Sequence, residues 1–479
     1  MIQAALQEQL PQLKMFLGDK MASSQNHLTS RRGVLRSTGA TATSALLYGL
    51  NPLEAFRPAV AEQHGELGLG VIGCRYQGSV IAGLAKIHGR LLAMADVDGS
   101  VRDLSAIDPS VQKQTGLSPE SIYEGVDRHE DYRRLLDDRR IHVILIGAPD
   151  HWHAGMLIDA LKAGKDVYVE KPITLTIDEG KQIRKVIKTT GGIVQVGSWQ
   201  RSDHRFRTAV EMVRAGRIGQ LRRIEVALGS NAVGGPFATT TAPNNLNWDR
   251  WLGQAALVPY TKERCHYTFR WWFDYAGGKM TDHGAHHLDI AQWAIGTDPI
   301  EVIPEATIPQ VNNGYNVPTA FRVLFRYPND VEMLVTDTGR NGILFEGSEG
   351  RIFVNRGSLS GVPVDDLVEQ PLPREAFGLY EFDNLNRPER SGKIEAIVNH
   401  MGNFFDCVAA RRQPISDVES QHRSATTCHL GNIACRLGRP LNWNATIEQF
   451  VADEEAIVAD EEANRFLRRP QRKGYEVSA

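Results

Sequence analysis

The sequence predicts an α/β protein of more than one domain, in which apolar strands alternate with helices over the first half of the folded chain. Strands are expected at 67–73, 90–95 and 143–147, with helical segments between them, which is the pattern of a parallel sheet. Further along, 321–327 and 332–336 alternate apolar and polar residues, as half-buried strands do. The 479 residues are 42% hydrophobic with a formal net charge of -3. This composition is typical of a globular protein and does not favour nucleic acid as a partner.

The N-terminal region has the layout of an export signal. Arg31 and Arg32 precede a mildly apolar segment at 40–50 and the small-residue triplet at 59–61. This order predicts a twin-arginine signal read by the Tat translocase, and a periplasmic or otherwise exported protein. A disordered basic tail would explain the arginines but not the segments behind them. Met21 is a possible alternative start. No apolar run approaches the roughly 20 residues that span a bilayer, so no membrane insertion is expected after export.

A glycine-containing turn follows the first strand. Gly73 permits a tight turn, and Gly78 permits close packing of the next helix. Arg75 occupies the position of the usual middle glycine, so its side chain must swing away or contact the phosphates itself. Asp96 ends the second strand, where an acidic residue holds a ribose 2′-hydroxyl, which favours NAD over NADP. The candidate cofactor contacts here are Gly73, Arg75, Tyr76, Gln77, Gly78 and Asp96. A doubly wound domain that binds no dinucleotide is the alternative.

Lys171 follows the strand expected at 166–169, within the sequence Glu170-Lys171-Pro172. A residue just past the carboxyl end of a parallel strand faces the crevice where ligands bind. We therefore expect Lys171 beside a substrate or a nicotinamide, although lysines at strand ends are more often surface residues.

A second cluster of ionisable residues lies at 277–289. Asp282, His286 and Asp289 are spaced i, i+4 and i+7, so a continuous helix would place them on one face. Asp282 could then orient the His286 ring as a general base requires. The alternatives are a helix whose polar edge caps its own first turn and, less often realised, a metal site built from the three residues. We expect no metal.

Together these motifs resemble those of the Gfo/Idh/MocA oxidoreductases, the family of glucose-fructose oxidoreductase and inositol 2-dehydrogenase, from about residue 67 to about residue 438. The matches are the turn at 73–78, the loop before His153, Glu170-Lys171-Pro172, and Gly277-Gly278 with Asp282, His286 and Asp289. The tryptophan-rich segments 248–253 and 271–275 resemble those of exported members.

The resemblance implies a second domain with a large, open, mostly antiparallel sheet that carries the substrate site. Lys171, Asp282 and His286 match the family's catalytic lysine, aspartate and histidine. The further cofactor contacts that it implies are Pro149, His153, Glu170 and Lys171 itself. The candidate substrate contacts are Trp152, Trp199, Arg201, Trp272, Asp282 and His286. Arg75 and Lys279 both stand where the family usually has glycine. A cis bond before Pro172 fits the family pattern.

These observations predict four regions. They are a signal region at 1–61, a Rossmann NAD-binding domain at 62–200, a substrate and catalytic α+β domain at 201–440, and a charged, mobile tail at 441–479.

The predicted function is hydride transfer between a hydroxyl carbon of a sugar, polyol or glycoside and a tightly held NAD. His286 would exchange the hydroxyl proton, Lys171 would stabilise the alkoxide, and Asp282 would position the substrate. Because an exported protein cannot draw on a free NAD pool, the cofactor must be recycled in place. This favours either paired oxidation and reduction of two sugars or a redox-neutral glycosidase. A carbohydrate-binding or sensing protein that retains the nucleotide is the alternative from another class. A homo-oligomer is expected.

Overall fold

The computed structural model describes residues 66–373, 392–453 and 457–479. All of them belong to one compact unit, Pro58–Ala479. The predicted export signal, including Arg31, Arg32 and the triplet at 59–61, lies outside the described residues. Among the helices that are described, none is both long enough and apolar enough to cross a membrane.

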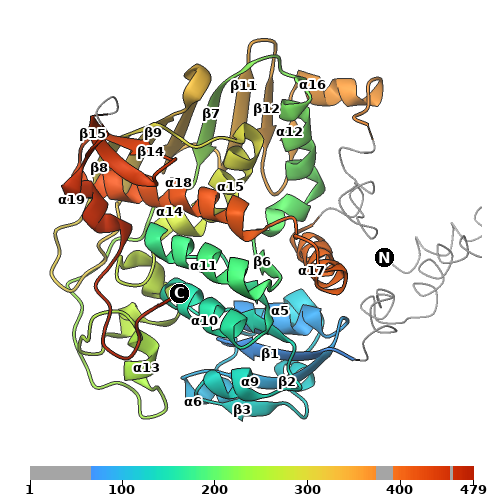
Figure 1. Ribbon diagram of the computed structural model, residues 1–479, viewed down its shortest axis with the longest axis vertical. Helices are drawn as coiled ribbons and strands as arrows, with labels where there is room; N and C mark the ends of the chain where they lie inside the picture. The colour runs from blue at the N-terminus through green and yellow to red at the C-terminus, as the bar shows by residue number, and fades with distance from the viewer. Residues whose placement is uncertain (1–65, 374–391, 454–456) are drawn as a thin grey trace, which may run out of the picture. The chain divides into compact units, whose positions relative to one another are not determined.

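The first domain is built on a six-stranded parallel sheet, which confirms the predicted fold class (Figure 1). Its strands are β1 (Gly68–Ile72), β2 (Arg90–Ala95), β3 (Asp127–His129), β4 (Val143–Ile146), β5 (Asp166–Val169) and β6 (Val194–Val196). The strand order is β3-β2-β1-β4-β5-β6. Every residue of β1 and β4 is buried, as expected for a sheet that is covered on both faces. From β1 the chain adds β2 and β3 on one side, and it then crosses over to add β4, β5 and β6 on the other side. Ligands bind at the carboxyl ends of the strands at such a switch point, which here lies between β1 and β4.

Helices cover this sheet, and the first one starts directly after the glycine turn. The helices of the domain are α5 (Gln77–Ala85), α6 (Gly99–Arg102), α7 (Ser110–Thr115), α8 (Pro119–Ile122), α9 (Arg133–Asp137), α10 (Asp150–Lys162) and α11 (Ile177–Thr190). The start of α11 is fixed by a capping box in which Thr176 and Glu179 bond each other's backbone N–H groups, a common N-terminal stabilising motif. The positions of α5 and α10 matter most for function, because both helices begin at the carboxyl edge of the sheet.

The second domain carries a ten-stranded sheet of order β13-β12-β11-β7-β10-β9-β8-β14-β15-β16. Its strands are β7 (Leu221–Ala227), β8 (Glu301–Thr307), β9 (Ala320–Arg326), β10 (Glu332–Thr336), β11 (Gly342–Gly347), β12 (Arg351–Val354), β13 (Leu359–Ser360), β14 (Leu441–Asn444), β15 (Gln449–Asp453) and β16 (Val458–Ala459). Only β7 and β10 pair in parallel, so the predicted mostly antiparallel sheet is confirmed.

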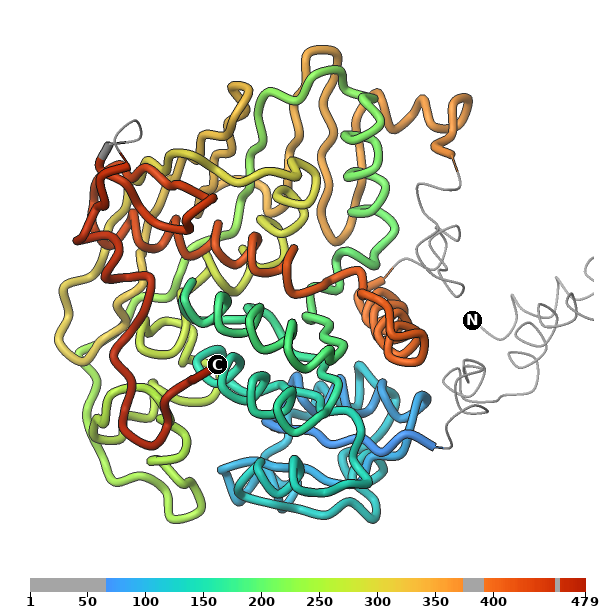
Figure 2. The backbone as a smooth tube through the Cα atoms, in the orientation of Figure 1, coloured from blue at the N-terminus to red at the C-terminus, as the bar shows by residue number. Residues whose placement is uncertain are grey.

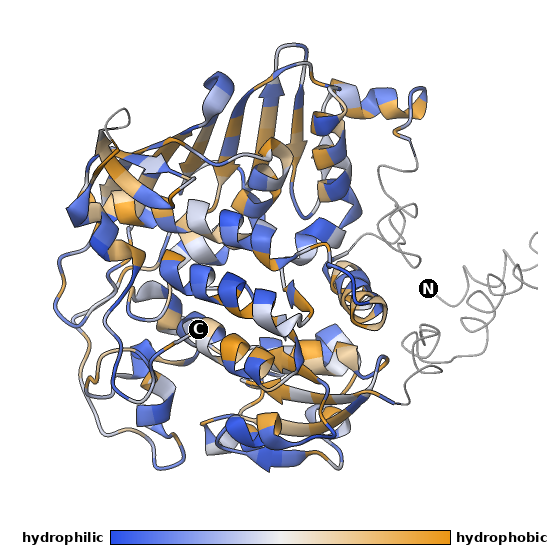
Figure 3. Cartoon of the chain, viewed as in Figure 1, coloured by the Kyte–Doolittle hydropathy of each residue, from blue (hydrophilic) through white to orange (hydrophobic). Residues whose placement is uncertain are grey.

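Helices pack on one face of this large sheet. The main ones are α12 (His204–Arg214), α14 (Gly278–Asp282), α15 (Gly284–Ile295) and α18 (Val418–Leu437). Helix α17 (Lys393–Ala410) instead contacts α5 and the short turn at 199–202. The shorter helices of this half of the chain are α13 (Trp248–Leu252), α16 (Val362–Asp365) and α19 (Glu461–Asn464). Beneath the main helices, alternate strand residues such as Phe325 and Phe345 form the core. Apolar colour runs through the strands of both sheets in Figure 3. The helix pair α14 and α15 carries the predicted catalytic residues Asp282 and His286.

The C-terminal segment is not the separate mobile tail that its charged composition predicted. Strands β14 and β15 belong to the large sheet, because Leu441 and Trp443 alternate with polar residues and are buried. The chain then returns to the first domain, as the red end of the tube in Figure 2 shows. There Arg469 pairs with Glu179 at 3.0 Å, and the Val477 side chain is buried. The second domain therefore extends past residue 440, and the end of the chain braces the first domain.

Candidate active site

A single cavity of about 1230 Å³ joins the two domains. It runs from the glycine turn after β1, past the carboxyl ends of β2, β4 and β5, to helices α14 and α15. The residues that define its course are Gly73, Asp96, Lys171, Trp199, Asp282 and His286. The structure thus brings the predicted cofactor turn and the predicted catalytic residues into one space.

The turn at one end of the cavity requires glycine. Gly73 has φ +79, and a Cβ atom there would lie 2.5 Å from the Ala148 backbone nitrogen. A Cβ atom on Gly78 would lie 1.9 Å from the Gly73 carbonyl oxygen. The turn therefore packs α5 directly against the β1 and β4 ends, and it leaves the backbone open for close approach by a pyrophosphate. All of the predicted cofactor contacts line the cavity except Gly78, which supports the turn from behind.

Arg75 swings away from the turn rather than remaining beside it. Its Nη2 donates to Oδ2 of Asp98 at 2.7 Å and lies 3.3 Å from Nε2 of His266. Burial, together with the Arg75 charge, lowers the pKa of His266 to about 4, so the ring is neutral and can accept this hydrogen bond. The arginine that replaces the middle glycine thus links the nucleotide turn to the second domain.

Asp96 holds the turn together. Its Oδ2 accepts the backbone N–H of Cys74 at 2.7 Å, and its Oδ1 accepts that of Asp98 at 3.0 Å. It also lines the cavity, as a residue that contacts a ribose must. Nearby, Gln77 donates to Glu170 at 2.9 Å, which ties the start of α5 to the segment that carries Lys171.

Lys171 and Asp282 meet across the cavity, although they come from different domains. The Lys171 Nζ donates to Oδ1 of Asp282 at 2.7 Å, and Arg270 lies 3.5 Å from Oδ2. Burial alone would raise the pKa of Asp282, but the charges of Lys171 and Arg270 hold it well below its usual range. Asp282 is therefore an ionised carboxylate. The Lys171-Pro172 bond is cis, as the sequence predicted.

His286 presents a neutral ring with a free nitrogen. Its Nδ1 is buried and has no hydrogen-bond partner among the described residues. Burial, and then the charges of Lys171 and Arg356, lower the pKa of His286 well below its usual range. The ring lies beside Trp199, with the two centroids 5.5 Å apart. Since Nδ1 is buried, the neutral imidazole can accept a proton from a ligand in the cavity only at its other nitrogen, Nε2.

The predicted pairing of Asp282 with His286 is wrong. The sequence argument assumed one continuous helix, but α14 ends at Asp282 and α15 begins at Gly284. The Asp282 carboxylate turns to Lys171 and Arg270 instead, because two cations attract it more strongly than a neutral ring does. His286 is therefore oriented by packing rather than by this carboxylate.

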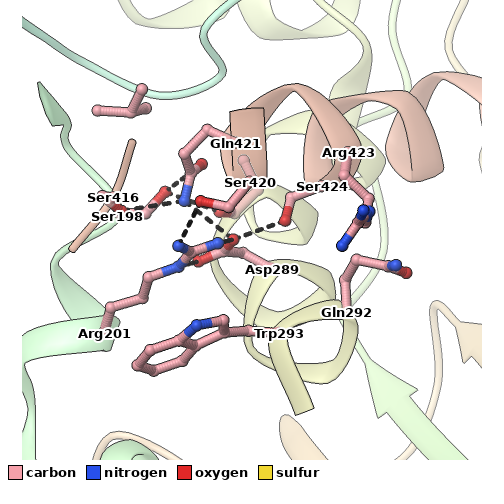
Figure 4. Close-up of polar contacts among 12 residues, drawn as sticks. Ser198, Arg201, Asp289, Gln292, Trp293, Ser416, Ser420, Gln421, Arg423 and Ser424 are labelled. Carbon is pink, nitrogen blue, oxygen red and sulfur yellow. Dashed lines mark hydrogen bonds and ion pairs between the residues drawn. The ribbon is translucent and has the colours of Figure 1, made fainter. Parts of the chain in front are cut away.

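Asp289 and Arg201 form a buried ion pair outside the cavity (Figure 4). Arg201 Nη2 and Nε donate to the two carboxylate oxygens at 2.6 and 2.9 Å, and their side chains are 1% and 0% exposed. Ser424 and Gln421 on α18 donate further hydrogen bonds to Asp289. The prediction that Arg201 contacts the substrate is corrected, because its guanidinium is committed to the core. The alternative metal site also fails, since Asp289 faces Arg201 and does not converge with Asp282 and His286.

The tryptophans divide into two groups. Trp272 does not line the cavity, because its Nε1 donates to the Glu263 carbonyl at 2.8 Å and Arg264 stacks on its ring. Its predicted substrate contact is therefore corrected. Trp152 and Trp199 do line the cavity, but only 6% and 3% of their surfaces are exposed. They form walls and do not offer an open ring face to a sugar.

Several charged residues of the cavity escaped the sequence analysis, and three of them lie at its substrate end: Asp150, Arg270 and Arg356. Asp150 directly follows Pro149 at the carboxyl end of β4, so the strand-end argument used for Lys171 could have found it. Burial raises the pKa of Asp150 to about 7. Arg270 and Arg356 lie on a short 3-10 turn and a loop, and no local pattern marks either one.

Comparison with known proteins places this site in a family. Residues 68–198 match the model described as "Oxidoreductase family, NAD-binding Rossmann fold", and residues 234–477 match "Oxidoreductase family, C-terminal alpha/beta domain" of the same family. The chain belongs to the Gfo/Idh/MocA oxidoreductase family. The predicted family is therefore confirmed, and the C-terminal segment is part of the family's second domain.

Curated relatives within the family include sugar and polyol enzymes. The chain is 38% identical over 91 residues to scyllo-inositol 2-dehydrogenase (NAD(+)) of Bacillus subtilis, covering 19% of this chain and 27% of that protein. It is 25% identical over 293 residues to inositol 2-dehydrogenase 2 of Saccharopolyspora erythraea, covering 61% and 68%. It is 31% identical over 217 residues to a glycosyl hydrolase family 109 protein of Shewanella baltica, covering 42% and 46%. Matches to the first three relatives span 27%, 57% and 46% of their lengths.

Solved structures share the fold. Levoglucosan dehydrogenase in complex with NADH and levoglucosan aligns with a TM-score of 0.57 at 18% identity, covering 78% of this chain and 99% of that one. Aldose-aldose oxidoreductase from Caulobacter crescentus, complexed with glycerol, aligns with a TM-score of 0.54 at 17% identity, covering 79% and 99%. The Gfo/Idh/MocA chain described here thus has the two-domain architecture of these enzymes.

Proposed function

We propose that this protein is an oxidoreductase that transfers hydride between a hydroxyl-bearing carbon of a sugar, polyol or glycoside and a tightly held NAD. The observation that carries the proposal is the single cavity in which the glycine turn, the Lys171–Asp282 ion pair and the free imidazole of His286 meet. Relatives named as inositol dehydrogenases support the substrate class.

The turn residues fit a dinucleotide. Gly73 and Gly78 leave no room for side chains between the turn and the strand ends, and the N-terminus of α5 points its free N–H groups toward the cavity end where phosphates bind in such folds. When bound, NAD would supply the hydride acceptor at C4 of its nicotinamide ring. Asp96 favours NAD over NADP, because a carboxylate at this position repels a 2′-phosphate.

In this proposal, His286, Lys171 and Asp282 carry out the proton transfer and stabilise the charge that develops on the substrate. As the alcohol carbon loses hydride and becomes a carbonyl carbon, its hydroxyl proton goes to Nε2 of His286, because Nδ1 is buried. Lys171 stabilises the negative charge that develops on the oxygen. Asp282 keeps the Lys171 ammonium in the cavity and accepts hydrogen bonds from neighbouring substrate hydroxyls. The return reaction uses the same groups in reverse order.

The test is the absorbance of reduced nicotinamide in the purified protein, with and without candidate sugars and polyols. We expect bound NAD to be released on denaturation, and reduction of that NAD when an accepted sugar is added. Absence of nucleotide, together with no NAD binding by titration, would contradict the proposal and favour a carbohydrate-sensing protein.

A redox-neutral glycosidase is the second candidate, because similarity to glycosyl hydrolase family 109 proteins supports it. In such a reaction, oxidation of a ring hydroxyl to a ketone acidifies the neighbouring C–H. Loss of that proton eliminates the aglycone, water adds to the resulting double bond, and the ketone is then reduced again. Release of an aglycone from a chromogenic glycoside, with no net accumulation of reduced cofactor, would distinguish this outcome.

We also propose that the protein is exported folded through the Tat translocase with its cofactor inside, and that it assembles as a homo-oligomer. The paired arginines and the triplet at 59–61 support export. N-terminal sequencing of the exported protein should find a mature chain that begins at Glu62. A chain still beginning at Met1 or Met21 would contradict cleavage, and a monomeric mass by light scattering would contradict assembly.

A further inference from the structure

Basic side chains gather at the substrate end of the cavity and just behind it. Four of them lie close enough to influence one another's charge: Lys171, Arg270, Lys279 and Arg356. The carboxyl groups beside them are Asp150, Glu170 and Asp282, and Asp203 acts on Arg356 from outside the cavity. Burial raises the pKa of Glu170 and raises that of Asp150 to about 7, so Asp150 is only partly ionised near neutral pH. The region therefore carries a net positive charge before any substrate binds.

Arg356 has no direct ion-pair partner among the described residues, although the charges of Asp282 and Asp203 act on it from longer range. Its Nε and Nη2 both donate to the neutral Oε1 of Gln200 at 3.3 Å, and its guanidinium lies 4.9 Å from the Trp199 ring centroid. Within residues 66–373, 392–453 and 457–479, no carboxylate lies within the 4.0 Å of an ion pair with it. The side chain lines the cavity and is exposed. Arg356 is thus a fixed cation at the cavity mouth.

Lys279 adds to this charge from behind the cavity wall. It stands where the family resemblance expects glycine, and its Nζ lies 3.3 Å from Nε2 of His283 and 5.8 Å from the Trp271 ring centroid. In the described part of the chain it too has no carboxylate within ion-pair distance. A partly buried cation such as Lys279 is unfavourable without a counter-ion, and an anion in the cavity would act on it and on the exposed Arg356 together.

We propose that the sugar accepted by this site carries an anionic oxygen group, a carboxylate or a sulfate or phosphate ester, bound by the Arg356 guanidinium at the cavity mouth. The inference rests on the proposed function and specifies its substrate class. Arginine suits this role, because its planar fork bonds two oxygens of an oxyanion at once. The positive charges of Arg270 and Lys279 attract the same anionic group from a longer distance.

Binding of the anionic group would also raise the basicity of His286. Burial and then the charges of Lys171 and Arg356 depress the pKa of His286. An anion paired with Arg356 cancels part of that field, so His286 becomes a better proton acceptor when the charged substrate is in place. Recognition of the anionic group is thereby coupled to the acid-base step.

The first experiment measures binding of matched neutral and charged sugars to the purified holoprotein by titration calorimetry. The probes are glucose, galactose and mannose, each with its uronate, 6-sulfate and 6-phosphate. We expect the charged member of at least one series to bind about tenfold or more tightly than its neutral parent, and the difference to shrink with added salt. The preferred anion identifies the group. Equal binding within every series, or no binding of any charged member, would overturn the inference.

The second experiment tests Arg356 directly. Arg356→Gln should reduce the ratio of charged to neutral affinity about tenfold or more, whereas Arg356→Lys should retain part of it. Arg351→Gln removes the same charge from an exposed position on the neighbouring strand and should leave the ratio unchanged. Equal ratios in Arg356→Gln and Arg351→Gln would overturn the inference.

The two proposals fail differently. Reduction of bound NAD by neutral sugars, without any charge preference, would contradict this inference and leave the proposed function intact. Charge-dependent binding with no reduction by any sugar would support the inference and contradict the proposed function.

Discussion

Lys171 and Asp282 come from different domains, 111 residues apart, and their side chains meet at 2.7 Å in the centre of the cavity. Both are only partly exposed, at 15% and 16%, so their attraction is less screened than that of a surface pair. The pair defines how the domains face each other at the site. It also fixes the Lys171 ammonium close enough to His286 for its charge to lower the pKa of that ring.

Replacing Lys171 with methionine should slow reduction of bound NAD by about 10²- to 10³-fold, because the developing alkoxide loses its cation. Bound NAD should be retained, since the turn at 73–78 is untouched. The measurement is single-turnover absorbance with an accepted sugar. Lys185→Met, on the exposed side of α11, is the control for removal of a lysine and should behave as wild type.

His286→Ala should lower turnover by about 10²- to 10⁴-fold, because it removes the proton acceptor. Fold and bound cofactor should survive, as monitored by thermal melting and nucleotide content. His129→Ala on the edge strand β3 removes a histidine that does not line the cavity and serves as control. A His286→Ala enzyme with near-native rates would exclude the ring as the base.

Asp150→Asn should change how stability depends on pH. The folded-state pKa of Asp150 is raised from 3.8 to about 7 by burial, so its contribution to stability is present below pH 4 and is lost as pH rises through about 7. The loss amounts to at most about 4 kcal/mol. Asparagine has no charge to bury. The wild-type melting temperature should therefore fall, relative to that of Asp150→Asn, between pH 5 and 8, and parallel curves would contradict the assignment.

Arg201→Met should destabilise the fold without altering the chemistry. It leaves the Asp289 carboxylate buried and unpaired, which costs about 3–5 kcal/mol in the free energy of unfolding. The double variant Arg201→Met/Asp289→Leu should recover much of that loss, because no charge remains in the core. Denaturant unfolding measures both. Turnover per folded molecule should stay near that of wild type, and a selective loss of sugar affinity would restore Arg201 as a substrate contact.

Local patterns were sufficient for the strands of the first domain and for the placement of Lys171 in the cavity. Strand runs, the turn at Gly73 and the strand-end position of Lys171 depend on neighbours in sequence, and the structure has them where they were predicted. The pairing of side chains was not predictable in the same way. Arg201 and Asp289 are 88 residues apart, and no spacing rule reports a contact at that distance.

Two predictions failed for identifiable physical reasons. The spacing of Asp282 and His286 implies a shared face only if the helix continues, and the break between α14 and α15 removes that condition. The interpretation of 441–479 as one charged tail overlooked the alternation of Leu441 and Trp443 at its uncharged start, which forms β14 and pairs with β8 and β15. Composition averages over a segment, whereas strand pairing depends on alternate positions.

The return of the C-terminal segment to the first domain has a consequence for synthesis of the protein. Arg469 is made 290 residues after Glu179, its partner on α11. At about 5 to 20 residues per second, the ribosome needs about 15 to 60 seconds to cover that distance. During this interval the nucleotide-binding domain lacks the C-terminal segment that packs against it. Helix α10 then lacks the contact that Tyr475 makes with Trp152. The first domain to emerge is thus the last to be completed, and its exposed edge is the surface that a chaperone would meet on the growing chain.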